Sequence, residues 1–111
     1  MVYNTVVVEI REFVDEYEVS PFDEWLTSQD VKVRARVQSR LTRLQAGNFG
    51  DHKSLGAGVH ELRIDFGPGY RVYYGKDGNT LVILLGGGTK KRQAKDINNA
   101  KLLWTRHKRN K

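Results

Sequence analysis

Two arginines occupy neighbouring strand-like runs in the segment ELRIDFGPGYRVYY, which spans residues 61–74. Side chains of a strand alternate between its faces, so burying the more apolar positions of both runs leaves Arg63, Arg71 and Tyr73 together on an open face. A register that pairs Asp65 with Arg71, and Arg63 with Tyr73, satisfies both patterns. Asp65 opposite Arg71 would by itself be an ordinary cross-strand ion pair of little energetic consequence. Two guanidinium groups on one face nevertheless form a candidate site for an anion such as phosphate.

A second group of cations follows the apolar run LVILLGGG, residues 81–88, where Lys90, Lys91 and Arg92 come directly after Thr89. Glycine permits a backbone to approach a ligand closely, and free N–H groups at the start of a helix favour anions. The segment GGGTKK lacks the spacing of a nucleotide-binding P-loop, so that kind of site is not expected. The pattern predicts a phosphate shared between these cations and the two arginines.

Other residues that commonly carry chemistry are few. The histidines His52, His60 and His107 form no metal-ligand spacing with one another or with a carboxylate, so we expect surface positions for them and no metal site. The chain has no cysteine, which excludes disulfides and thiolate metal sites. Carboxylates become scarce after Asp77. If a phosphodiester is cleaved here, the sequence favours arginine and lysine stabilising the transition state over a carboxylate pair acting as acid and base.

The charge is strongly polarised along the 111 residues. Residues 1–30 hold one basic and eight acidic side chains, whereas residues 89–111 hold nine basic and one acidic, within a net charge of +6. A basic end of this kind favours a polyanionic partner, most often a nucleic acid, while the acidic end can neutralise it or face another protein. No apolar run is long enough to span a membrane and no secretory signal is recognisable, so we expect a cytoplasmic location.

The residues fit one domain over 1–111, with a basic tail from about residue 105. The hydrophobic pattern predicts elements in the order β-α-α-β-β-β-α. This order is typical of an α+β fold, here a small, mainly antiparallel twisted sheet with the helices packed on one face and the other face open. The expected strands lie at about 4–13, 59–65, 70–75 and 80–85, and the expected helices at about 21–28, 31–46 and 94–108.

Local signals predict where several of these elements begin and end. Ser20 before Pro21 is a helix N-cap with proline at the first helical position. Asp30 can cap a second helix, which Gly47 ends. The glycine-rich segment 47–58 shows no periodicity and is interpreted as a loop.

Several motifs occur in a specific order along the chain: GNxGDxK, GVxELRI, GPGYRVYY, a strand that ends in Gly-Gly, then a lysine, a glutamine and the pair DI. Through residues 40–101 the chain resembles the RelE/ParE superfamily of bacterial toxins, and specifically its HigB-like branch of addiction module killer proteins. Counted from PFDEWL, the likeness covers about four-fifths of the chain. It implies the toxin of a type II toxin–antitoxin pair, with the compact fold expected above and no metal or organic cofactor.

Members of the RelE type cut mRNA in the ribosomal A site, where the RNA 2′-hydroxyl attacks the adjacent phosphate with the help of basic side chains. The resemblance places Arg71 at the arginine of the GYR motif and Arg63 at the basic position of the preceding strand. Lys90 or Lys91 would be the basic residue after the glycines. The partners implied are the ribosome, mRNA and a helix-turn-helix antitoxin in a hetero-oligomeric complex. The further RNA contacts expected are Lys53, Arg92 and Tyr73, the last by stacking on a base.

Other functions stay open at this point. A toxin of the ParE type would poison DNA gyrase through the same scaffold, and a binding module without catalysis would only dock on its antitoxin or on RNA. Three clustered basic positions on an open face favour RNA. The second helix presents a row of cations that is either a solvated surface or a ribosomal or antitoxin contact. That row consists of Lys32, Arg34, Arg36, Arg40 and Arg43.

The chain departs from the HigB-like branch at two places. Thr89 stands where an acidic residue is usual, and Lys91 and Arg92 replace small polar residues, so the present segment is more basic. The N-terminal segment VDEYEVSPFDEWL is also longer and more acidic than the usual start. The identity of the base that would accept the 2′-hydroxyl proton does not follow from the sequence.

Overall fold

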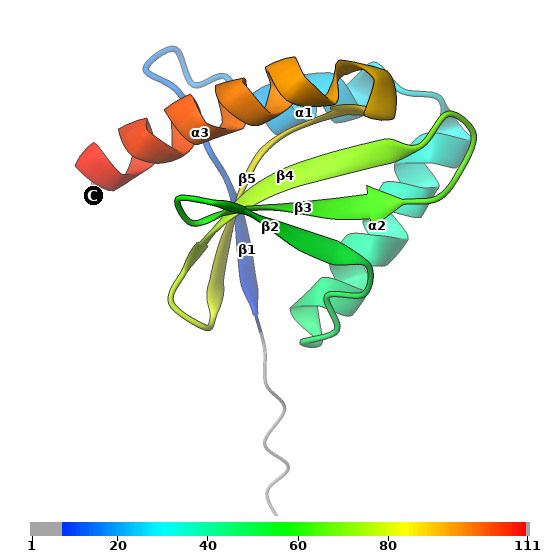
Figure 1. Ribbon diagram of the computed structural model, residues 1–111, viewed down its shortest axis with the longest axis horizontal. Coiled ribbons are helices and arrows are strands. Elements are labelled where there is room, and N and C mark those ends of the chain that lie inside the picture. The colour runs from blue at the N-terminus through cyan, green and yellow to red at the C-terminus, as the bar shows by residue number, and fades with distance from the viewer. Residues whose placement is uncertain (1–7, 111) are drawn as a thin grey trace, which may run out of the picture.

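The computed structural model describes residues 8–110 of the chain. A five-stranded sheet with strand order β1-β5-β4-β3-β2 forms the centre of the domain, and helices lie against it (Figure 1). β1 runs parallel to β5, and the other neighbouring strands are antiparallel. The predicted α+β class and mainly antiparallel sheet are confirmed. The elements are β1 (Glu9–Glu12), α1 (Pro21–Thr27), α2 (Val31–Gln45), β2 (His52–Gly56), β3 (Val59–Ile64), β4 (Tyr70–Asp77), β5 (Leu81–Thr89), the 3-10 turn η1 (Lys90–Arg92) and α3 (Gln93–Arg109).

Polar side chains begin α1 and α2 as predicted. The Ser20 hydroxyl accepts a hydrogen bond from the backbone N–H of Asp23 at 3.0 Å. The Asp30 carboxylate likewise accepts one from the N–H of Val33 at 3.0 Å. Gly47 follows the end of α2 with φ of +90, in the left-handed region where glycine has no steric penalty. Short-range signals therefore define this helical hairpin.

Helices cover both faces of the sheet, which corrects the prediction that they pack on one face only. α1 and α2 bury Leu62 and Val72 on one face, whereas α3 contributes Ala100 and Trp104 to a second core that contains Tyr73 on the other. The physical reason lies in β5, where residues 82–85 are all buried. A strand that is apolar on both sides needs a partner on both sides.

A strand, β2, replaces much of the loop predicted at residues 47–58. It pairs antiparallel with β3, and the turn between them passes through Gly56, Ala57 and Gly58, all with positive φ. Four of the five residues of β2 are exposed and only Leu55 is half-buried. The strand therefore lacks the alternation that would reveal it in the sequence, and its pairing with β3 decides its conformation.

β5 extends beyond its predicted end. Residues 86–88 continue the strand because they pair with residues 71–73 of β4. η1 then leads directly into α3, which begins at Gln93. At the other end of the chain, residues 4–7 of the first predicted strand lie outside the described residues.

Candidate functional site

Arg63 and Arg71 lie directly opposite each other on β3 and β4. The prediction that they share a face is therefore correct, but the predicted register is wrong. Arg71 pairs with Arg63 rather than with Asp65, and Tyr73 pairs with Glu61. Both registers keep the same faces, so the alternation of side chains did not distinguish them. Like charges directly opposite each other destabilise a sheet, and this pair therefore requires nearby anions.

Each arginine has one carboxylate of the protein beside it. Arg63 Nη2 lies 2.8 Å from Asp51 Oδ1, and both side chains reach solvent. Arg71 Nε lies 3.7 Å from Glu61 Oε2, with Glu61 only 1% exposed. The Gln93 side-chain amide donates to both Glu61 oxygens, at 2.9 and 3.2 Å. The start of α3 thus holds Glu61 in place beside Arg71, whose Nε has no hydrogen-bond partner among the described residues.

Arg63, Arg71 and Lys90 line a single open pocket of about 390 Å³. They come from β3, β4 and η1, which the sheet brings together at one end. The Lys90 N–H donates to the Gly69 carbonyl at 3.0 Å and so ties η1 to the loop between β3 and β4. The predicted association of Lys90 with the two arginines is therefore present in the fold. The other lining residues are Asp51, Ile64, Asp65, Gly67, Pro68 and Gly69.

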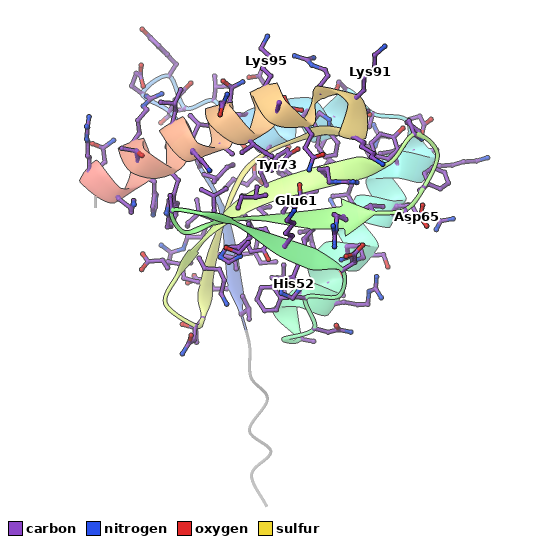
Figure 2. The ribbon with its side chains drawn as sticks, viewed as in Figure 1. His52, Glu61, Asp65, Tyr73, Lys91 and Lys95 are labelled. Carbon is purple, nitrogen blue, oxygen red and sulfur yellow. The ribbon has the colours of Figure 1, made fainter. Side chains whose placement is uncertain are left out.

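Three further cations predicted for the site do not line this pocket. Lys91 and Arg92 are exposed on η1, and Figure 2 shows the Lys91 side chain pointing away from the sheet. Lys53 is exposed on β2, where it pairs with Glu61 and shares the face of the two arginines at the edge of the sheet. Of the two lysines that follow β5, the pocket contains Lys90.

Tyr73 is buried beneath α3, which corrects the expectation that it is exposed and stacks on a base. It is 1% exposed, and its hydroxyl has no hydrogen-bond partner among the described residues. Burial, together with the nearby charge of Asp96, raises the pKa of the Tyr73 phenol well above its ordinary value. Figure 2 shows Tyr73 and Glu61 pointing from the sheet toward α3. Tyr73 therefore belongs to the core that joins α3 to the sheet.

The glycines of β5 make room for the protein's own side chains. A Cβ atom on Gly87 would meet the indole ring of Trp25, and one on Gly88 would meet the carboxylate of Asp96. The three glycines also pair with β4 as ordinary strand residues. For Gly87 and Gly88, the expectation that they bring the backbone close to a ligand is therefore corrected, because Trp25 of α1 and Asp96 of α3 occupy that space.

Arg40 is a positioning residue that the sequence did not distinguish from the other cations of α2. Its guanidinium donates to the carbonyls of Phe49 and Asp51, each at 3.1 Å, and to the carbonyl of Arg63. Burial, with a smaller effect of Arg43, lowers the pKa of Arg40. These contacts hold the segment before β2 against the end of β3 and thereby place Asp51 beside Arg63. Nothing near Arg40 in the sequence indicates these contacts, because the groups to which it donates are distant along the chain. The sequence alone therefore suggests an ordinary surface position.

Between residues 8 and 110, no group of three or more His, Asp or Glu side chains is arranged to hold a metal ion. His60 stacks on Tyr74 with ring centroids 5.3 Å apart, on the face of the sheet away from the pocket. Over the same residues, no helix has both the length and the apolar character that crossing a bilayer requires.

These features define a small α+β domain with a cationic pocket at one end of its sheet. Residues 24–107 match the family described as phage derived protein Gp49-like (DUF891). A relative from Haemophilus influenzae, described as an uncharacterized protein, is 53% identical over 83 residues, which cover 74% of this chain and 84% of the relative. The chain therefore belongs to the Gp49-like family, a family of the toxin–antitoxin type, and this membership implies an antitoxin partner.

Proposed function

We propose that this protein is a HigB-like toxin of the RelE/ParE superfamily that cleaves mRNA on the ribosome in the cytoplasm and is neutralised by a helix-turn-helix antitoxin. The observation that carries the proposal is the direct opposition of Arg63 and Arg71 beside Lys90 in one pocket. Opposed like charges cost stability, and a phosphate bound between them offsets that cost. Membership of a toxin–antitoxin family supports the same function.

The proposed reaction is an attack of the RNA 2′-hydroxyl oxygen on the adjacent phosphorus, with cleavage of the bond to the 5′ oxygen. Arg71 and Arg63 neutralise the charge that develops on the nonbridging oxygens. Lys90 donates a proton to the departing 5′ oxygen, which leaves a 2′,3′-cyclic phosphate and a 5′-hydroxyl group. A pocket carboxylate accepts the 2′-hydroxyl proton. Asp51 already pairs with Arg63, so we assign this role to Asp65.

Arg63→Ala provides the first test, because Arg63 reaches solvent and its loss leaves only the exposed Asp51 unpaired. Arg11→Ala is a matched control, since Arg11 also forms an exposed ion pair, at 2.9 Å with Glu9, on the strand at the far edge of the sheet. Loss of one group that stabilises transition-state charge is expected to slow cleavage by about 100-fold or more. Induction of Arg63→Ala without the antitoxin should therefore permit growth, whereas Arg11→Ala should still arrest it.

Arg71→Ala is expected to abolish growth arrest and to retain antitoxin binding, which also confirms that the variant is folded. Primer extension on translated mRNA, run beside a gyrase cleavage assay, separates the proposed reaction from gyrase poisoning of the ParE type. Poisoning of gyrase without mRNA cleavage would refute the proposal. Undiminished toxicity of folded Arg71→Ala would remove this residue from the site.

A further inference from the structure

A second basic pocket, of about 210 Å³, lies between α2 and the end of β3. Its cations come from one stripe of α2, because residues three or four apart on a helix are neighbours. Like charges at this spacing destabilise a helix, so the repulsion among these arginines lowers the stability of α2. The pocket is lined by Arg36, Ser39, Arg40, Arg43, Ile64 and Asp65.

The arginines of this second pocket differ in what they already contact. Arg40 is committed to backbone carbonyl groups and is partly buried. The guanidinium of Arg36 lies over the ring of Phe66, 4.5 Å from its centroid, and this contact orients it beside the loop between β3 and β4. Arg36 and Arg43 are exposed. The guanidinium groups of Arg36 and Arg43 are therefore accessible to solvent at this pocket. Asp65 is the carboxylate residue in the lining of the pocket.

The second pocket adjoins the first. Ile64 and Asp65 line both of them, so the two pockets meet at the end of β3. Figure 2 shows Asp65 at this end of the sheet, by the loop that leads into β4. A strand of nucleic acid with a phosphate between Arg63 and Arg71 can continue past Asp65 into the second pocket.

We propose that Arg36 and Arg43 form a subsite for a second phosphate of the same RNA strand, a few nucleotides from the phosphate that is cleaved. This inference rests on the proposed function, because it requires RNA in the first pocket. RNA suits the subsite better than a protein partner, since its lining is dominated by guanidinium groups, which bind phosphate oxygens in pairs. The large apolar side chains that are exposed among the described residues, Val14, Tyr17, Val31 and Leu102, do not line it.

The salt dependence of RNA binding tests the subsite. Each phosphate contact with single-stranded nucleic acid contributes about 0.7 to the slope of log K against log salt concentration. Arg36→Gln/Arg43→Gln removes the contact with one phosphate and should therefore lower the slope by about 0.7. Between about 50 and 200 mM salt, the affinity of the wild type should then fall about 2.6-fold further than that of the double variant.

The probe is a labelled 2′-O-methyl nonanucleotide, which cannot undergo attack by a 2′-hydroxyl, with binding measured by fluorescence anisotropy. Lys95→Gln/Arg109→Gln is the matched control, because it removes two exposed cations from α3, outside both pockets. This control should leave the slope unchanged. Competition by a dinucleotide with a single phosphate should be weakened by Arg63→Gln and not by the α2 double variant.

The outcomes separate the subsite from the proposed function. If Arg63→Gln weakens binding of both probes while the α2 double variant behaves like the α3 control, the subsite is refuted and the first pocket stands. If Arg63→Gln also has no effect on either probe, the first pocket and the subsite both fail. If the α2 double variant binds RNA normally but no longer forms the antitoxin complex, the surface is a protein interface and the subsite is refuted.

Discussion

Glu61→Gln tests whether the buried carboxylate beneath α3 positions Arg71. Glu61 is 1% exposed, and its carboxylate lies 3.7 Å from Arg71 Nε while it accepts two hydrogen bonds from Gln93. The glutamine side chain has the same shape but no charge. It also replaces one carboxylate oxygen by an NH2 group, which only donates, so one acceptor oxygen is left for Arg71 and Gln93.

The expected loss follows from the burial of the pair. At 3.7 Å and an effective dielectric constant of about 20, the attraction between the two charges is about 4.5 kcal/mol before desolvation is counted. Breaking a buried pair by removing one partner typically costs about 3–5 kcal/mol. The Arg71 side chain keeps 12% exposure, so we expect the low end, a decrease of about 3 kcal/mol in the free energy of unfolding. For a domain of this size the corresponding decrease in Tm is about 12 °C.

Urea and thermal unfolding of the purified variants measure this loss. Asp51→Asn is the control, because its ion pair with Arg63 is exposed and should contribute no more than about 1 kcal/mol. In a double-mutant cycle, Glu61→Gln and Arg71→Gln should be less destabilising together than the sum of the two single effects. If Glu61→Gln costs no more than Asp51→Asn, or if the cycle shows no coupling, Glu61 does not position Arg71 and this reasoning is refuted.

Two further predictions concern the contacts of β5 with the helices. Gly87→Ala forces a Cβ into the ring of Trp25 and should cost about 1–3 kcal/mol, whereas Gly86→Ala, which has nothing within 4 Å, should stay within about 0.5 kcal/mol of the wild type. Equal Tm values for the two variants would contradict this packing. Burial raises the pKa of Asp96, although nearby cations offset the effect in part, so folding favours its protonated form. The Asp96 carboxyl makes its whole contribution to stability at pH values below its pKa in the unfolded chain, about 4. This contribution is lost as the pH rises through its pKa in the folded protein. Asp96→Asn should therefore stabilise the protein at pH 7, and urea unfolding should show this advantage shrinking toward pH 4; an advantage that does not change with pH would exclude the titration of Asp96 as its cause.

The helix starts and the faces of the central strands could be predicted because they depend on short stretches of chain. Ser20 and Asp30 each accept a hydrogen bond from an N–H group three residues later. The alternation along β3 and β4 places Arg63 and Arg71 on one face whatever the rest of the fold does. The association of Lys90 with them followed from its place directly after the neighbouring strand, β5.

The surroundings of those arginines could not be predicted in the same way. Glu61 and Gln93 are separated by 32 residues and meet only because α3 crosses the face of the sheet. Glu61 lies between His60 and Leu62 in VHELRI and shares its face with Arg63, as a solvent-facing residue would, so nothing in the local pattern indicates its burial. Arg40 gave no signal either, since every group to which it donates lies nine or more residues away.

By itself the sequence determined the class of fold, the helix starts and the shared face of Arg63 and Arg71. These properties follow from backbone geometry and from neighbours along the chain. Only the tertiary structure decided the strand register, the covering of that face by α3 and the pairing of Arg71 with Glu61. The register could shift by two residues without changing which side chains faced inward, so the choice depended on how distant apolar surfaces fit together.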